Sequence, residues 1–203
     1  MRKIGIYGGS FDPIHLGHIA LVMGIMEQRG LDHVLFIPAA QSPMKKECTA
    51  SAADRCAMVE QALREVPQCS MLLLEVQRDP PSYTINTIKE IRRLKKVEEE
   101  DQLFILLGQD ALQHFHQWQS VHELVHLAQP LVALRTGFSD SGMWQNDPLL
   151  APIIREGICQ TPLFDISSTA VRDRLKKKLF CGHMLNAHVL EYIVEEKLYG
   201  YDS

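Results

Sequence analysis

The sequence predicts an α/β fold with a doubly wound, open parallel sheet, helices on both faces and a small helical C-terminal part. Two observations carry this prediction. Short apolar runs of strand length alternate with segments of helical periodicity along most of the chain, and this alternation is typical of a parallel sheet covered on both faces. The 203 residues, 46% of them hydrophobic, are enough for one sizeable core, so a single domain over residues 1–203 is expected.

The apolar runs and the periodic segments give the order of the elements. Buried strands are expected at residues 3–7, 34–37, 71–74, 103–107 and 130–134, with a last strand at 163–165. Helices are expected at residues 17–28, 53–66, 84–97 and 110–115, and after the last strand at 169–178 and 188–197. Residues 135–152 are rich in Gly, Ser, Asp and Pro and are expected to interrupt the alternation.

The composition excludes several classes of protein. The 21 Lys and Arg against 25 Asp and Glu give a net charge of −4, which offers no general basic surface, so no nucleic-acid partner is expected. Five cysteines, never spaced as C-x-x-C, fit neither a disulfide framework nor a zinc ribbon and favour a reducing cytoplasm. No apolar run approaches the roughly 18 residues of a membrane helix, so we expect a soluble protein without a membrane partner. A homo-oligomer is compatible with the sequence.

The first expected strand opens into a loop suited to bind phosphate. The residues concerned are Gly8, Gly9, Ser10, Phe11, His15 and His18. The two glycines let backbone amides approach a ligand closely, and the helix that starts near residue 17 points its unpaired N–H groups toward the same space. His15 and His18 can converge on one anion, each with a ring N–H and, when protonated, a charge. A turn or a structural histidine would explain one of these residues alone but not the whole pattern.

A second segment of this kind lies at residues 165–172, where a short strand is expected to enter a helix. Its residues are Ile166, Ser167, Ser168, Thr169 and Arg172. The three hydroxyl residues are N-cap candidates, and Arg172 lies about one turn further on, so its guanidinium can reach the same helix start. The segment therefore predicts a second anion site, with an ordinary capped helix and a surface arginine as the alternative.

The two segments resemble the two signatures of the nucleotidylyltransferase superfamily, G-x-F-x-P-x-H-x-G-H and S-x-T-x-x-R. Members of this superfamily join a nucleoside monophosphate to a phosphate-bearing acceptor, and the resemblance implies that the doubly wound sheet is Rossmann-like. It also implies ATP binding by Gly8, Gly9, Ser10, Phe11, His18, Gly108, Asp110, Ile166, Ser167, Ser168, Thr169 and Arg172. The implied catalytic groups are His15, His18, Lys45 and Arg172.

The middle of the chain is similar to the bacterial nicotinate-nucleotide adenylyltransferases and less so to the shorter pantetheine-phosphate adenylyltransferases. Residues 37–45 follow the first family's P-x-x-x-P-P-H-K loop with two departures. Ser42 replaces a proline and Met44 replaces the histidine, whereas Lys45 is retained and supplies a cation for phosphate. The resemblance implies that Lys45 and Ser10 bind the acceptor nucleotide.

Further elements of the same family follow along the chain. Residues 75–78 match its E-x-x-R segment and residues 82–87 its S-Y-T-x-x-T segment. Residues 108–110 match its G-x-D element, and Trp118 matches its tryptophan. The match extends over nearly the whole chain.

These elements have implied roles and structural alternatives. Asp110, with Gly108 permitting close approach, is implied to accept hydrogen bonds from the ATP ribose. Trp118 is implied to stack on the pyridinium ring of the acceptor, and helix-start amides near Thr84, with Tyr83, to hold its carboxylate. The alternatives are a first-turn carboxylate for Asp110, core packing for Trp118 and a helix cap for Thr84.

Residues 122–126, His-Glu-Leu-Val-His, fit the zinc-enzyme string H-E-x-x-H. In zinc enzymes this string lies in the middle of a long amphipathic helix, whereas here Pro130 follows within four residues. Solvated helix histidines are therefore the expectation, and no metal site made by protein side chains is predicted.

The resemblance implies an enzyme of NAD biosynthesis. It would transfer the adenylyl group of ATP to nicotinate mononucleotide, giving nicotinate adenine dinucleotide and pyrophosphate. ATP and nicotinate mononucleotide are the expected small-molecule substrates, and Mg²⁺ is the expected cofactor, carried by ATP. Two alternatives stay open. One is another transfer of the same superfamily, to phosphopantetheine or from CTP, and the other is a non-catalytic nucleotide-binding module.

Overall fold

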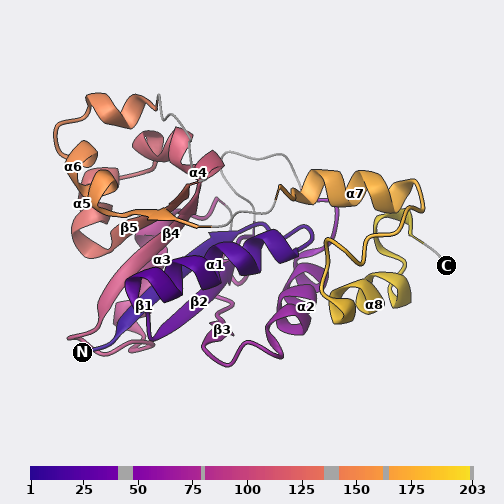
Figure 1. Ribbon diagram of the computed structural model, residues 1–203. Helices are drawn as coiled ribbons and strands as arrows, with labels where there is room; N and C mark the ends of the chain where they lie inside the picture. The colour runs from indigo at the N-terminus through magenta and orange to yellow at the C-terminus, as the bar shows by residue number, and fades with distance from the viewer. Residues whose placement is uncertain (41–47, 79–80, 135–141, 162–164, 202–203) are drawn as a thin grey trace.

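A computed structural model of the chain describes residues 1–40, 48–78, 81–134, 142–161 and 165–201 (Figure 1). Its centre is a six-stranded parallel sheet with the strand order β3-β2-β1-β4-β5-β6. The strands are β1 (Lys3–Gly9), β2 (His33–Pro38), β3 (Cys69–Met71), β4 (Gln102–Gly108), β5 (Gln129–Leu134) and β6 (Ile158–Gln160). The order reverses its direction at β1, which confirms the doubly wound, Rossmann-like sheet.

Helices connect the strands. The α-helices are α1 (Leu16–Arg29), α2 (Ala52–Leu63), α3 (Thr84–Arg93), α4 (Gln109–His114), α5 (Val121–Leu127), α6 (Leu150–Glu156), α7 (Ser168–Lys176) and α8 (Ala187–Glu195). Short 3₁₀ turns are η1 (Phe115–Gln117), η2 (Met143–Asn146) and η3 (Leu198–Gly200). In Figure 1, α7 and α8 lie at one end of the molecule, with α8 beside α2, which confirms the small helical C-terminal part.

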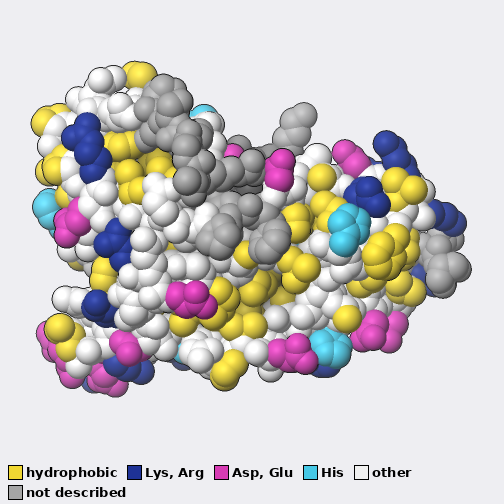
Figure 2. Space-filling view, in the orientation of Figure 1, with side chains coloured by type: hydrophobic (Ala, Val, Ile, Leu, Met, Phe, Trp, Pro, Cys, Tyr) yellow, Lys and Arg dark blue, Asp and Glu magenta, His cyan; other side chains and the backbone are white. Residues whose placement is uncertain are grey.

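The core has two parts because alternate residues of each strand point to opposite faces of the sheet. One part contains Val22 of α1, Met58 of α2 and Ile193 of α8. The other contains Ile88 of α3 and Leu124 of α5. Most charged side chains lie at the surface, and a few, such as that of Arg55, are buried. On the face shown in Figure 2, those of Lys and Arg are dispersed among those of Asp and Glu.

The edge strands differ from the sequence prediction. A strand was expected at residues 71–74, but β3 ends at Met71; the Leu72 N–H makes one more bond, to Phe36 O, before the chain leaves the sheet. The expected strand at residues 163–165 falls largely outside the described residues, and Asp165 is in no strand. The last described strand is β6, which the sequence missed because only its middle residue is fully buried.

One helix was missed, because α6 begins inside the segment 135–152 that was expected to be irregular. α5, with seven residues, contains the histidines that were expected to lie in a helix at residues 122–126. Both form because they bury apolar side chains against the second part of the core, as Leu124 and Ile154 do. Within the described ranges, no helix combines the length and the apolar composition needed to cross a membrane.

Candidate active site

The carboxyl ends of β1 and β4 mark the point where the strand order reverses, and ligands of such sheets bind in the crevice at this point. Gly8, near the end of β1, is exposed, and a Cβ there would meet no atom within 4 Å. The loop then turns at Phe11, whose φ is 49°. The Phe11 ring is buried against Tyr7 and Phe36, with ring centroids 5.7 Å from each. This packing holds the left-handed backbone of the loop in place.

His15 and His18 lie at the start of α1, as the sequence predicts. His15 is the N-cap, and its backbone N–H donates to Nδ1 of His18 at 3.2 Å. The two rings stack with centroids 3.7 Å apart. Because Nδ1 of His18 accepts a hydrogen bond, the neutral ring carries its proton on Nε2. The fold thus selects the tautomer of His18 that donates through Nε2.

His15 is more strongly constrained than the sequence indicates. Its side chain is 7% exposed, and burial lowers the pKa of its ring to about 4. His15 is therefore neutral at pH 7, and it offers a phosphate an N–H donor rather than a charge. Its Nδ1 is buried without a hydrogen-bond partner among the described atoms. The positive charge of the site must come from other groups.

The second signature is joined directly to the first. The Ser168 hydroxyl donates to Pro13 O at 2.9 Å, and Arg172 Nη1 donates to Asp12 O at 2.6 Å. Arg172 Nη2 also donates to the Thr169 hydroxyl at 3.2 Å. The starts of α1 and α7 therefore belong to one site, although their residues lie more than 150 positions apart.

Smaller contacts complete this junction. The Ser167 hydroxyl is the N-cap of α7 and accepts from the backbone N–H of Ala170 at 3.1 Å. Ile166 lies against the start of α1, because a Cβ placed on Gly17 would come within 3.5 Å of the Ile166 Cβ. A side chain larger than hydrogen at residue 17 would also press on the His15 ring at 3.1 Å.

Asp12 is the functional residue that the sequence analysis missed. Its carboxylate is 5% exposed and accepts three hydrogen bonds. Oδ1 accepts from Ala50 N at 3.1 Å and from the Tyr199 hydroxyl at 2.8 Å, and Oδ2 accepts from Thr49 N at 2.7 Å. Arg172 Nη1 lies 3.8 Å from Oδ2. Asp12 therefore ties together four separate parts of the chain.

Arg55 is a second group that was missed. It projects from α2, is 1% exposed and donates to three backbone carbonyls: Ser10 O at 2.6 Å, Ala39 O at 2.7 Å and Ala40 O at 3.1 Å. The guanidinium holds the ends of β1 and β2 together and places a positive charge behind the phosphate-binding loop. The sequence carried one signal for it, since Arg55 falls on the same helical face as the buried Met58.

Further predicted site residues lie at the starts of α3 and α4. Tyr83 and Thr84, predicted to bind the acceptor, are the N-cap and the first residue of α3. Gly108 and Asp110 were predicted to bind ATP. Gly108 ends β4 and is the N-cap of α4, with Asp110 exposed in the first turn. These four residues take no part in the hydrogen bonds described above between the two signatures.

Trp118 and Lys45 were also predicted to bind the acceptor. Trp118 is half-buried and packs edge-on against Phe115 at a centroid distance of 5.1 Å. Core packing therefore accounts for one part of its ring, and the other part is exposed. Lys45, with the departures at Ser42 and Met44, lies outside the described residues.

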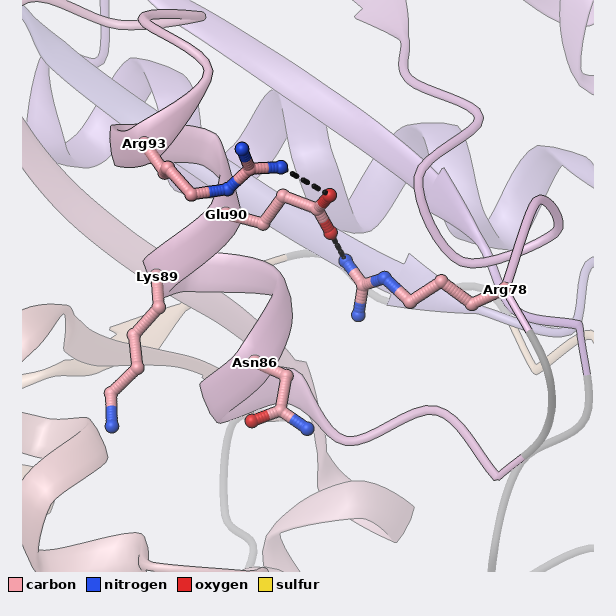
Figure 3. A pocket seen from close by; sticks show the side chains of 5 residues that line it. All are labelled: Arg78, Asn86, Lys89, Glu90 and Arg93. Atoms are coloured by element: carbon pink, nitrogen blue, oxygen red, sulfur yellow. Dashed lines mark hydrogen bonds and ion pairs between the residues drawn. The ribbon is translucent and has the colours of Figure 1, made fainter.

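The E-x-x-R segment supports the start of α3. Thr87, on the buried side of the helix, donates to Glu75 Oε1 at 2.6 Å, and burial raises the pKa of Glu75. Arg78, which precedes α3, forms an ion pair with Glu90 of that helix, and Glu90 also pairs with Arg93 (Figure 3). A surface cavity lies among these side chains, lined by Arg78, Asn86, Lys89, Glu90 and Arg93. The network fixes the segment after β3 on α3.

The H-E-x-x-H string forms α5, and two of its side chains make polar contacts. His122 Nε2 lies 2.7 Å from Asp147 Oδ2, and Glu123 pairs with Lys89 at 2.7 Å. No group of three potential His, Cys, Asp or Glu metal ligands occurs in the part of the chain that the structure describes. These contacts give the string a structural role.

Comparison with known proteins places the chain in a family. The family model for cytidylyltransferase-like proteins matches residues 6–174. A Bacillus subtilis protein named nicotinate-nucleotide adenylyltransferase is 34% identical over 98% of this chain and 99% of its own length. A Carboxydothermus hydrogenoformans protein named "probable nicotinate-nucleotide adenylyltransferase" is 36% identical over 97% and 98%. The chain belongs to the nicotinate-nucleotide adenylyltransferase family.

The fold of this family is also seen in a more distant solved structure. The Plasmodium falciparum nicotinic acid mononucleotide adenylyltransferase complexed with NaAD superposes with a TM-score of 0.76. The match covers 100% of this chain and 99% of the other, at 18% identity. At this identity the likeness concerns the fold, and the nicotinate-nucleotide adenylyltransferase family is shown by the closer relatives.

The low pKa of His15 predicts a pH-dependent stability for this family member. The unfolded chain takes up a proton at His15 near pH 6.5, whereas the folded chain takes it up only near pH 4. The free energy of unfolding should therefore fall as the pH is lowered from 6.5 toward 4. The loss between pH 7 and pH 5 should be about 2 kcal/mol.

Urea unfolding of the wild type and of His15→Asn at pH 7 and pH 5 measures this loss. Asn retains N-cap ability but does not titrate. We expect His15→Asn to lose less stability than the wild type on acidification, by about the same 2 kcal/mol. His126→Asn, at an exposed position of α5, is the control and should behave as the wild type. An unchanged pH dependence in His15→Asn would contradict the assignment.

Proposed function

We propose that this chain transfers the adenylyl group of ATP to nicotinate mononucleotide, releasing pyrophosphate and giving nicotinate adenine dinucleotide for NAD biosynthesis. One structural observation carries the proposal: Ser168 and Arg172 bond the loop that leads to His15 and His18, so two phosphate-binding signatures share one site. Relatives at 34–36% identity carry this activity in their names. We further propose that residues 1–203 act as one domain, since Tyr199 near the C-terminus bonds Asp12.

The reaction needs no covalent protein intermediate. A 5′-phosphate oxygen of nicotinate mononucleotide attacks the α-phosphorus of ATP and forms the new P–O bond. The bond from the α-phosphorus to the bridging oxygen breaks, and its electron pair leaves with pyrophosphate. The nucleophile is already anionic at neutral pH, so the protein has to align the two phosphates and stabilise the charge that develops between them.

The site supplies donors and cations for this task. His18 donates through Nε2, which its hydrogen bond with His15 N–H sets, and His15 donates as a neutral ring. Arg172, whose side chain is 23% exposed, supplies a cation that substrate can reach, while Arg55 supplies a buried one. The N-termini of α1 and α7 add their N–H groups. Lys45 is proposed as a further cation for phosphate.

The nucleotide and the acceptor are proposed to occupy different parts of the crevice. ATP is proposed to contact the residues implied by the resemblance in the loop after β1, at Gly108 and Asp110, and at the start of α7. Ser10, Lys45, Tyr83, Thr84 and Trp118 are proposed to bind nicotinate mononucleotide. The partly exposed Trp118 side chain supports stacking, and the start of α3 supports binding of the carboxylate by backbone N–H groups.

Magnesium is proposed to enter as part of the ATP substrate. The described residues contain no cluster of three candidate ligands, so their donor set does not form a protein cage for the ion. The ion supplies positive charge to the phosphate oxygens, and it is held mainly by ATP and water. The five free thiols support a cytoplasmic location for the enzyme.

The proposed acceptor predicts a specific substrate preference. With ATP and Mg²⁺, pyrophosphate should form with nicotinate mononucleotide and not with phosphopantetheine. A carboxylate at helix-start N–H groups gains charge-assisted hydrogen bonds of roughly 1.5–3 kcal/mol each, which a neutral amide lacks. We therefore expect kcat/KM for nicotinate mononucleotide to exceed that for nicotinamide mononucleotide by about 10- to 150-fold.

A panel of acceptors, with pyrophosphate release as the readout, makes this measurement. CTP in place of ATP tests the cytidylyl alternative. Turnover on phosphopantetheine or with CTP alone would assign the chain to another branch of the superfamily. Nucleotide binding without any turnover would favour a binding module. A ratio of kcat/KM near one between nicotinate and nicotinamide mononucleotide would show that the pocket does not distinguish the carboxylate from the amide.

The role of His18 predicts a loss of rate rather than of binding. Removal of a donor that acts on charge developed only in the transition state typically lowers kcat about 100- to 1000-fold. His18→Ala would also lose the acceptor for the His15 N–H, so His18→Asn is the sharper variant. Asn retains an oxygen near the place of Nδ1 and lacks Nε2.

We expect His18→Asn to keep the melting temperature within a few degrees of the wild type, to keep KM for ATP within a fewfold, and to lower kcat about 100-fold or more. Steady-state kinetics and thermal unfolding provide the readouts. Near-normal kcat in His18→Asn would make His18 a structural residue.

A further inference from the structure

We propose that Tyr199 is a positioning residue of the active site: its hydroxyl holds the Asp12 carboxylate and thereby leaves Arg172 available to the phosphates of the substrate. Tyr199 lies 187 positions after Asp12, in the 3₁₀ turn η3. The inference rests on the proposed function, because it takes Arg172 to be a phosphate ligand.

The C-terminal turn is built to bring the phenol inward. Lys197 and Tyr199 have φ values of 51° and 57°, a left-handed conformation that is unfavourable for residues with side chains. The turn nevertheless forms with the Tyr199 side chain buried at 7% exposure and its hydroxyl 2.8 Å from Asp12 Oδ1. Burial and this hydrogen bond raise the pKa of Tyr199, so the phenol stays protonated and acts as a donor.

The hydrogen bonds of Asp12 show why this donor affects Arg172. The carboxylate receives three neutral donors, namely Ala50 N, Thr49 N and the Tyr199 hydroxyl. Arg172 Nη1 is 3.8 Å from Oδ2, beyond hydrogen-bonding distance, and makes its short contact with the backbone carbonyl of Asp12 at 2.6 Å. The carboxylate is thus satisfied mostly without the guanidinium.

Loss of the phenol hydroxyl changes this balance. Removal of one of the three donors of a buried carboxylate is unfavourable, and Arg172, 3.8 Å from Oδ2, is the cation placed to replace it. A closer ion pair between Arg172 and Asp12 would then compete with binding of substrate phosphate. The predicted consequence is weaker nucleotide binding at an otherwise folded site.

Tyr192 provides a matched control for the same part of the chain. Its hydroxyl donates to Asp54 Oδ1 at 3.0 Å and joins α8 to α2, but it does not reach Asp12. Tyr192→Phe therefore removes a tyrosine–aspartate hydrogen bond between α8 and α2 and leaves the hydrogen bonds of the Asp12 carboxylate unchanged. A role of Tyr199 limited to docking of the C-terminal part would make the two variants alike.

The test compares Tyr199→Phe and Tyr192→Phe with the wild type below the melting temperatures of all three. Affinity for ATP is measured by titration calorimetry, and kcat and KM by pyrophosphate release. We expect Tyr199→Phe to weaken ATP affinity and lower kcat/KM about tenfold, and Tyr192→Phe to change both less than about twofold. A lower melting temperature of Tyr199→Phe with unchanged ATP affinity and kinetics would overturn the proposal.

A double variant tests whether Tyr199 acts through Arg172. In an Arg172→Lys background, the effect of Tyr199→Phe on ATP affinity should shrink to less than about threefold, because Tyr199 acts on ATP binding through the guanidinium of Arg172. An undiminished effect would overturn the mechanism. Calorimetry needs no turnover, so a wild type that binds ATP but does not adenylylate nicotinate mononucleotide would refute the proposed function separately from the role of Tyr199.

Discussion

The buried carboxylate of Asp12 is the constraint on which the rest of the site depends. A carboxylate at 5% exposure is tolerated only when hydrogen bonds replace its water, and here the donors come from residues 49–50 and 199, with Arg172 close by. To satisfy this one group, the chain must bring the end of β1, the approach to α2, the start of α7 and the C-terminal turn together. The phosphate-binding geometry therefore follows from an internal electrostatic requirement.

The charges of the site are divided between buried and partly exposed groups. Arg55 is held by three carbonyls and cannot follow the substrate, and His15 is held neutral by burial, so its stacking on His18 avoids repulsion between two cations. Arg172 is partly exposed and bonded mainly to a neutral carbonyl. Such an arrangement suits a nucleotidyl transfer, in which a preformed loop orients two phosphates and an accessible cation stabilises the charge that develops on pyrophosphate.

The sequence predicted the doubly wound sheet and the two signatures because periodicity and local motifs are properties of short segments. It missed β6, since a three-residue strand with one buried side chain leaves no apolar run, and it missed α6, whose seven residues are stabilised by the core rather than by their own pattern. Asp12 stands inside the first signature, but its donors are 37 to 187 positions away, so no local pattern could reveal its role. The functional residues missed are those defined by long-range contacts.

Hydrogen exchange in Asp12→Asn tests most directly whether this carboxylate joins the separate segments. Asn keeps the shape of the side chain but presents an NH₂ group to at least one donor. We expect the amides of Thr49 and Ala50, the first turn of α7 and the turn η3 to exchange at least about tenfold faster, while those in the middle of β1 and β4 keep their protection. Unchanged exchange at Thr49, Ala50 and α7 would show that the segments hold together without Asp12 and would contradict its central role.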